Sequence, residues 1–326
     1  MNRETMRLRA ALLREVRNFL TEKGYLEVDT PLLAPALIPE PSIEVFRTSL
    51  ESPYRPSREL FLIPSPELWM KRLLAEGSGD IFQICRAFRN WEQEGSAHSN
   101  EFTILEWYTL NAGYRESMDI TDQFLRRVSA IPGADPSGAA KLRGPCRRIR
   151  MEEACRELAG FDLSACAERE AMADAARRLD IRFDAEDSWE TLFNRVFLTL
   201  VEPNLPRDRP LILYDYPAGI PTLSRPIPGT PWSARWELYI GGMECANCFT
   251  EETDPDRIAR YFIEAAEEKK TAVVPHPADS RLVQTLASGF PSCSGVALGI
   301  DRLLMVLSGA PAIGGVIFFP FSDTIS

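Results

Sequence analysis

The first part of the chain alternates between an apolar stripe with helical spacing and proline-rich segments. Apolar residues recur at spacings of three and four from Leu12 to Leu20, which predicts an N-terminal helix that Gly24 ends. Residues 35–58 contain five prolines and predict a surface loop. Residues 60–63 predict a short strand, and the Ser-Pro-Glu sequence that follows is typical of a helix start.

Strand patterns then appear on both sides of a helical middle segment. Residues 80–89 and 101–110 predict two adjacent antiparallel strands joined by a polar loop. Residues 115–205 are mostly helical in pattern, and their clearest helix runs from Trp189 to Val201. Amphipathic residues 255–270 predict another helix, and residues 301–307 a shorter one. Further strands are predicted over residues 211–214, 236–240, 243–249, 294–300 and 315–319.

This order of elements predicts the fold class. A regular alternation of strands and helices is absent, so a doubly wound parallel sheet is not expected. We predict an α+β fold with a mostly antiparallel sheet flanked by helices, built as a single domain over residues 1–326.

Composition narrows the class of protein. The chain has 37 Lys and Arg against 47 Asp and Glu, a net charge of −10, which argues against a protein that mainly grips nucleic-acid phosphates. Seven scattered cysteines predict reduced thiols and a cytoplasmic location. Residues 303–322 are uncharged, but their glycines and prolines would break a membrane-spanning helix, so no membrane association is expected.

The first candidate site residues lie on the predicted strand at residues 101–110. Its period of two places Phe102, Glu106 and Tyr108 on one face, and a carboxylate among aromatic side chains is unusual for a plain core. Arg89 stands at the end of the neighbouring strand. Alternatively, residues 101–110 form an edge strand with Glu106 in water. The alternative for Arg89 is a solvated side chain at a strand end.

A second cluster is acidic. Glu244, Asn247 and Glu251 are oxygen donors of the kind that Mg²⁺ prefers. The spacing of seven puts the two carboxylates on opposite faces of a regular strand, so a shared metal ion requires a bulge or bend near Asn247. The rival metal is zinc, because of the pair Cys245 and Cys248, but a zinc site needs a second ligand pair.

A third cluster joins a strand of small residues to a helix. Gly295 and Gly299 allow close approach of another group to the backbone, and Arg302 at the helix start suits a phosphate. Such glycines can also serve packing alone.

These clusters together resemble the signature motifs of class II aminoacyl-tRNA synthetases of the lysyl type. Residues 24–33 are similar to motif 1, residues 88–108 to motif 2 and residues 295–304 to motif 3. Residues 243–253 resemble the acidic strand of the lysyl enzymes. The resemblance covers the whole chain and implies the synthetase catalytic fold, a homodimer, and use of ATP with Mg²⁺.

Motif 1 begins at residue 24, which leaves no room for an anticodon-binding domain before it. The chain therefore resembles stand-alone paralogues of this family, which attach (R)-β-lysine to a lysine side chain of elongation factor P. The resemblance implies that the chain activates (R)-β-lysine or lysine as an acyl-adenylate and transfers it to that acceptor protein, with tRNA not expected as a partner. The alternatives are another amino acid or acceptor, and a non-catalytic regulatory protein.

The resemblance also implies roles for individual residues. Arg89 and Arg302 would be catalytic, each holding a phosphate of ATP. The residues expected to bind ATP are Arg89, Glu92, Asn100, Phe102, Glu244, Cys245, Gly299 and Arg302. Those expected to bind the amino acid are Ser65, Pro66, Glu67, Glu106, Tyr108, Asn247, Glu251 and Ala297. Glu244 and Glu251 would hold the metal ion.

Overall fold

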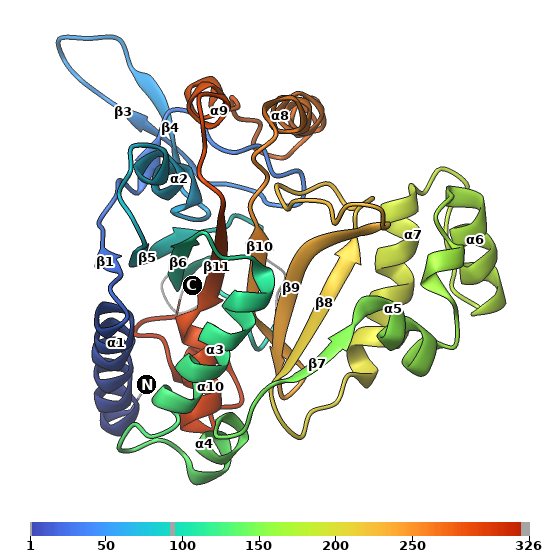
Figure 1. The fold of residues 1–326 in the computed structure, drawn as a ribbon. Helices are drawn as coiled ribbons and strands as arrows, with labels where there is room; N and C mark the ends of the chain where they lie inside the picture. Colours follow the sequence, from blue (N-terminus) through green and yellow to red (C-terminus); the bar gives the residue numbers. More distant parts are fainter. Residues whose placement is uncertain (1, 92–94, 321–326) are drawn as a thin grey trace.

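An eight-stranded sheet in the order β1-β5-β6-β11-β10-β9-β8-β7 forms the centre of the computed structural model, which describes residues 2–91 and 95–320 (Figure 1). Neighbouring strands are antiparallel except for the pairs β1–β5 and β7–β8. The strands are β1 (Leu26–Glu27), β5 (Ile81–Phe88), β6 (Glu101–Leu110), β7 (Arg147–Arg150), β8 (Leu211–Pro217), β9 (Trp232–Ile240), β10 (Met243–Thr250) and β11 (Cys293–Gly299). The predicted α+β class with a mostly antiparallel sheet is confirmed.

One face of this sheet is apolar and covered by helices. Alternate residues such as Trp107, Val296 and Trp236 join one buried cluster with α1 (Arg3–Glu22), α3 (Tyr114–Val128) and α10 (Ile300–Ser308). The α1 helix begins at the cap residue Asn2, whose side chain accepts a hydrogen bond from the Thr5 N–H, and it buries the predicted stripe. The short helix α4 (Pro136–Leu142) packs beside α3 and α10.

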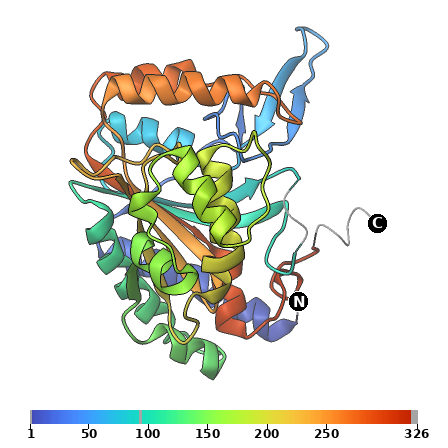
Figure 2. The ribbon, with the colours of Figure 1, turned by 90° about the vertical axis from the view of Figure 1, so that its right-hand side faces the viewer.

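A second group of elements packs on the other side of β5, β6 and β11. It comprises α2 (Glu67–Ala75), α8 (Pro255–Lys269), α9 (Ser280–Ala287) and a small sheet in the order β2-β4-β3. The strands of that sheet are β2 (Leu33–Ala34), β3 (Arg47–Leu50) and β4 (Arg58–Leu62). Ile81 and Tyr108 of the large sheet share a buried cluster with these helices. Figure 2 shows the helices over the sheet from the side. This face of the sheet is therefore partly covered.

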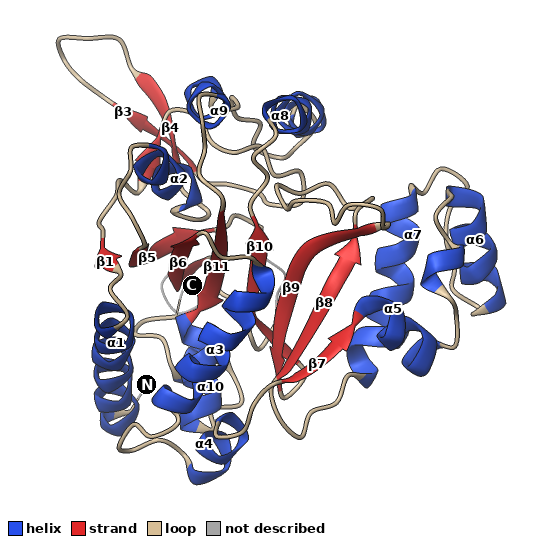
Figure 3. Cartoon of the chain, viewed as in Figure 1, coloured by secondary structure: helices blue, strands red, loops and turns tan. Residues whose placement is uncertain are grey.

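The middle of the chain forms a helical layer beside β7 and β8, as Figure 3 shows. It has its own buried cluster, to which the sheet contributes Leu211, Leu213 and Tyr239. Its elements are α5 (Met151–Ala154), π-helical turns over Cys155–Ala159 and Phe197–Val201, 3-10 turns over Leu163–Ala165 and Glu202–Asn204, α6 (Arg169–Arg178) and α7 (Trp189–Val196). The predicted helical middle is confirmed, with the strand β7 as an addition.

Two predictions of local structure were wrong. The expected loop at residues 35–58 contains β3, all of whose residues are exposed and which pairs only with β4, so it shows no apolar alternation. The expected strand at residues 315–319 begins in a 3-10 turn, Ile313–Gly315, and has no strand partner among the described residues. Val316 and Ile317 pack into the cluster around α10, whereas the two phenylalanines that follow are exposed. Within the described ranges, no helix has the length and apolar character needed to cross a membrane.

Candidate active site

A row of polar and small residues crosses the sheet on the face opposite the apolar cluster. The register places Gln83 opposite Glu106, Glu106 opposite Ala297, and Ala297 opposite Asn247. On the far side, Asn247 is opposite Glu237. Because directly paired residues point to the same face, three segments that are distant in sequence supply one continuous surface.

A β-bulge in β10 adds Glu244 to this surface. Glu244 pairs with Tyr239 of β9 and Ala246 pairs with Leu238, so Cys245 is an extra residue on the β10 side. The irregularity expected near Asn247 is therefore present two residues earlier. It brings Glu244 and Asn247 to the wall of the same cavity.

That cavity has a volume of about 180 Å³ and lies between β6, β10, β11 and the start of α10. It is bounded also by the chain between β5 and β6, through Arg89 and residues 97–99. The predicted site residues that line it are Arg89, Phe102, Glu244, Cys245, Asn247, Ala297, Gly299 and Arg302. A Cβ at Gly299 would meet only atoms of Arg302, at 3.7 Å or more, so the space above this glycine is open.

Arg302 is held in the cavity wall by backbone carbonyls rather than by acidic side chains. Its Nη1 donates to the Glu244 carbonyl at 2.8 Å and its Nε to the Ala97 carbonyl at 3.1 Å. It lies in the first turn of α10, where the helix dipole adds to its positive charge. Among the described residues no carboxylate forms an ion pair with Arg302, and a fixed cation in this position suits an anionic group of a ligand.

A buried ion pair behind Arg302 joins three elements of the site. Arg9 of α1 contacts the Asp301 carboxylate at 2.5 Å and donates to the Thr103 hydroxyl at 2.6 Å. The Thr103 N–H donates to the other oxygen of Asp301 at 2.6 Å. Since Thr103 follows Phe102 and Asp301 precedes Arg302, this network fixes both cavity residues relative to α1.

Arg89 presents an unpaired donor at the cavity. Its guanidinium lies 5.2 Å from the centre of the Phe102 ring, and its buried Nε has no hydrogen-bond partner among the described residues. A buried orphan donor indicates a missing acceptor, and a phosphate oxygen is the acceptor that arginine best satisfies. Asn100 does not line the cavity; its amide donates to the Arg89 carbonyl at 2.9 Å and holds the loop end. Glu92 lies outside the described residues.

The predicted amino-acid side of the site is acidic and buried. The Ser65 hydroxyl donates to the Glu106 carboxylate at 2.5 Å and accepts the Glu67 N–H at 3.0 Å. Tyr108 donates to the other oxygen of Glu106 at 3.5 Å. Burial and repulsion from Glu67 raise the pKa of Glu106 to about 8. A cationic ligand would restore the charged form. Pro66 precedes α2, and its carbonyl accepts the first N–H groups of that helix.

Gly295 lets two of these groups approach each other. A Cβ at this position would lie 2.4 Å from Cε1 of Tyr108 and 2.6 Å from Oε1 of Glu251. Both side chains are almost fully buried. The groups that closely approach the backbone at Gly295 are therefore protein side chains. At Gly299, by contrast, the space is open.

The two candidate metal carboxylates have different neighbours. Burial, followed by repulsion from Glu237, raises the pKa of Glu244 to about 7. Glu251 instead forms an ion pair with Lys71 at 2.7 Å, on the amino-acid side. The second carboxylate beside Glu244 is thus Glu237, which sequence reasoning missed although it stands seven residues earlier on the neighbouring strand.

The donor set around Glu244 fits a magnesium ion bound together with a nucleotide. Glu244 is a cavity-wall carboxylate, whereas Glu237 does not line the cavity, accepts hydrogen bonds from Tyr216 and Tyr239, and forms an ion pair with Arg235. No group of three or more His, Cys, Asp or Glu side chains in the described part of the chain could hold a metal ion. Magnesium with a nucleotide needs fewer protein ligands, because phosphate oxygens and water complete its shell.

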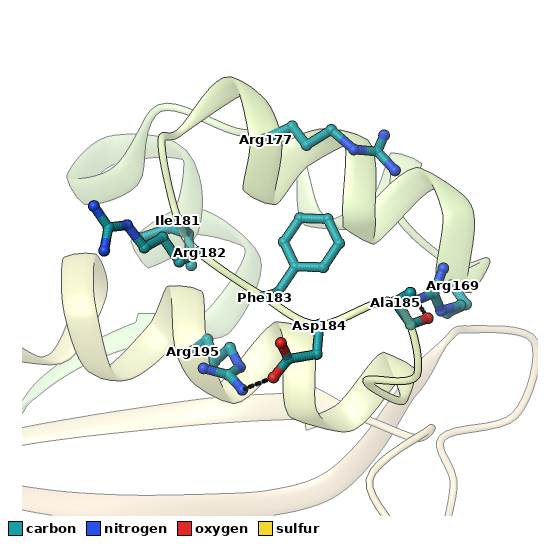
Figure 4. Close-up of a pocket in the computed structure, with 8 residues that line it drawn as sticks. All are labelled: Arg169, Arg177, Ile181, Arg182, Phe183, Asp184, Ala185 and Arg195. Atoms are coloured by element: carbon teal, nitrogen blue, oxygen red, sulfur yellow. Dashed lines mark hydrogen bonds and ion pairs between the residues drawn. The ribbon is translucent and has the colours of Figure 1, made fainter.

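A larger hollow of about 750 Å³ lies away from this site, in the helical layer, and several arginines line it (Figure 4). Three of them, Arg169, Arg177 and Arg195, form ion pairs with acidic neighbours. Figure 4 shows the ion pair of Arg195 with Asp184, at 3.6 Å, and Arg169 contacts Glu170 at 2.6 Å. None of the predicted site residues lines this hollow. The sheet cavity, with its orphan arginine donor, is the stronger candidate for the active site.

The chain belongs to a family of class II tRNA synthetases. The profile of the family described as tRNA synthetases class II (D, K and N) matches residues 1–323, in agreement with the resemblance of the motifs. This family uses ATP, generally with Mg²⁺.

Several similar proteins carry the name elongation factor P–(R)-β-lysine ligase. The protein of Vibrio vulnificus is 34% identical over 329 residues, which cover 98% of this chain and 96% of that protein. The protein of Vibrio cholerae is 36% identical, with 97% and 95% covered. The protein of Klebsiella pneumoniae is also 36% identical, with 95% and 93% covered.

Proposed function

We propose that this chain activates (R)-β-lysine, or lysine, with ATP and transfers the acyl group to a lysine side chain of elongation factor P. The observation that carries the proposal is one sheet face on which an arginine-lined cavity adjoins a pocket of buried carboxylates. The near-full-length similarity to proteins named as ligases of this kind supports it.

In the first step the substrate carboxylate attacks the α-phosphorus of ATP. A C–O–P linkage forms, the bond to the β-phosphate breaks, and pyrophosphate leaves. A carboxylate is already a nucleophile, so the protein contributes mainly position and charge. Arg89 would hold the α-phosphate through its unpaired Nε, Arg302 the γ-phosphate, and Phe102 would stack on adenine.

The remaining ATP-side residues would shape the cavity. Glu244 would hold Mg²⁺ at the cavity wall, and the metal ion when bound would neutralise phosphate charge. Gly299 would give the nucleotide room, since the space above it is open. Cys245 would act through the bulge that turns Glu244 toward the cavity. Asn100 would secure the loop that carries Arg89.

The amino-acid pocket explains a preference for a substrate with two ammonium groups. Glu67, Glu106 and Glu251 are carboxylates in a largely desolvated region, where Lys71 pairs with two of them, so additional positive charge from a substrate would stabilise the group. Ser65 and Tyr108 orient Glu106. Asn247 and Ala297 would form the wall between this pocket and the nucleotide.

In the second step the neutral amine of the acceptor lysine attacks the acyl carbonyl. An amide bond forms, the bond to the AMP oxygen breaks, and the amine loses a proton to solvent. This step needs an open route for a protein side chain rather than a tRNA end, and we propose that tRNA takes no part.

Pyrophosphate exchange and acceptor labelling test the proposal. We expect ATP–pyrophosphate exchange with (R)-β-lysine that is faster than with α-lysine, and covalent labelling of elongation factor P that is lost when its acceptor lysine is replaced. Faster exchange with α-lysine would overturn the choice of substrate. Labelling of a different protein would overturn the choice of acceptor, and absence of exchange with every amino acid would overturn the enzyme assignment.

We also propose that residues 1–326 act as one catalytic domain, as a homodimer and in the cytoplasm. Exposed apolar side chains at Leu26 and Leu33, in and next to the segment that resembles motif 1, support the dimer. Sedimentation equilibrium checks it: a monomer at micromolar concentration would contradict the proposed dimer.

A further inference from the structure

Lys71 lies at the centre of the acidic pocket, although sequence reasoning assigned it no role. It stands one turn after Glu67 on α2 and is 1% exposed. Its Nζ lies 2.5 Å from Oε1 of Glu67 and 2.7 Å from Oε2 of Glu251. A lysine is rarely buried so completely unless acidic groups hold it.

The two ion pairs of Lys71 connect elements that are distant in the sequence. Glu67 is in the first turn of α2, whereas Glu251 directly follows β10. Burial lowers the pKa of Lys71, but attraction by Glu251 and Glu67 outweighs it, so the ammonium stays charged. The ion therefore fixes the separation of two carboxylates that are proposed to bind the amino acid.

The shortest contacts of Lys71 use Oε1 of Glu67 and Oε2 of Glu251. Oε1 of Glu251 lies above Gly295. Glu40 is a further, partly buried carboxyl that interacts electrostatically with Glu67 and Lys71. Once ionised, these carboxylates outnumber the single ammonium of Lys71, so the pocket favours a substrate with additional positive charge, such as a diamino acid.

We propose that Lys71 is a positioning and specificity-determining residue, an internal counter-ion that spaces Glu67 and Glu251 and matches the pocket to a diamino acid. The inference rests on the proposed function, because it requires that this pocket take the amino acid. Lys71 does not contact substrate in this account; it acts through the two carboxylates.

Another buried lysine provides a matched control. Lys269 of α8 is also 1% exposed, but its Nζ donates to the Ile43 carbonyl and it forms no ion pair with Glu67 or Glu251. Lys269→Met therefore removes a buried ammonium of the same kind that forms no ion pair with Glu67 or Glu251. It reports what the loss of a buried lysine does to the fold in general.

The test is pyrophosphate exchange with the full chain, varying the diamino acid and ATP separately. We expect Lys71→Met to raise KM for the diamino acid by about tenfold or more, because the two carboxylates lose their shared partner, while KM for ATP stays within about twofold. Lys269→Met should leave both values within about twofold of wild type. Lys71→Arg, which keeps the charge, should have a KM for the diamino acid nearer to wild type than Lys71→Met.

The outcomes are distinguishable. If Lys71→Met and wild type share one KM for the diamino acid, or if Lys71→Arg and Lys71→Met are equally impaired, this inference is wrong and the proposed function stands. If Lys71→Met raises both KM values equally, the residue is structural only. If wild type supports no exchange with any diamino acid, the proposed function fails and this inference fails with it.

Discussion

Replacing Gly295 by alanine tests the geometry of the amino-acid pocket directly. The new methyl group would lie 2.4 Å from Tyr108 Cε1 and 2.6 Å from Glu251 Oε1, whereas ordinary contact begins at 3.4 Å. Both side chains must therefore move by about 1 Å. Tyr108 and Glu251 are 3% and 2% exposed, so neither has free space on its other side.

The expected effect has two parts. Forcing a methyl group into a packed region costs about 1–3 kcal/mol of the free energy of unfolding. Displacing Glu251 from a substrate ammonium removes a charge-assisted hydrogen bond, worth about 1.5–3 kcal/mol, which corresponds to a KM for the diamino acid roughly 10- to 150-fold higher. The ATP cavity on the other side of Ala297 should be unaffected.

Gly299→Ala is the matched control on the same strand. Its Cβ would meet only Arg302, at 3.7 Å, and its φ of −73° is ordinary for alanine, so the fold should tolerate the change. Its methyl group would enter the nucleotide cavity instead. In pyrophosphate exchange we expect Gly295→Ala to raise KM for the diamino acid and Gly299→Ala to raise KM for ATP.

A wild-type KM for the diamino acid in a folded Gly295→Ala protein would refute this reasoning. So would a pair of variants that both impair the same substrate. Circular dichroism and thermal unfolding separate these results from a loss of fold.

Three further predictions concern single residues. Arg89→Gln should lower kcat by about 10²- to 10³-fold at unchanged secondary structure, because a donor to developing phosphate charge is lost; near-normal exchange would contradict the phosphate role. Arg9→Met should lower the free energy of unfolding by about 3–5 kcal/mol in urea titrations, because Asp301 stays buried without its partner, and Arg9→Met with Asp301→Asn should recover part of the loss. The pKa of Glu106 rises from its ordinary value to about 8 on folding, so the native state binds the extra proton and stability falls as pH rises toward 8. Wild type should therefore lose more stability than Glu106→Gln between pH 5 and pH 8 in urea titrations, and parallel losses would contradict the assignment.

Periodicity predicted the parts of the fold that bury an apolar face. The stripe of α1 was visible because its buried and exposed positions alternate with helical spacing. The paired strands β5 and β6 were visible because two mostly buried runs flank a polar loop. The exposed strand β3 was missed because nothing in it is buried. Val316 and its neighbours were misread as a strand because apolar composition alone does not distinguish a packed turn from a strand.

The candidate site was predictable where a motif fixes a backbone position. Arg89 and Arg302 lie at a strand end and a helix start, and both reach one cavity. Partnerships across the fold were not predictable from sequence. Which acid accompanies Glu244 depends on strand register, and the burial of Lys71 depends on how α2 docks against β10.

The extra residue at Cys245 has a consequence for how this chain tolerates changes in length. Glu244 and Glu251 are seven positions apart, an odd number that would put them on opposite faces of a regular strand. The bulge at Cys245 takes up one position and lets both carboxylates lie on the same side of the sheet. Deleting Cys245 would leave an even spacing, so a regular strand would still present both carboxylates on that side. Losing the bulge without a deletion would instead turn Glu244 into the apolar layer, although the sequence motif would be unchanged. In this strand, backbone register and residue number act together.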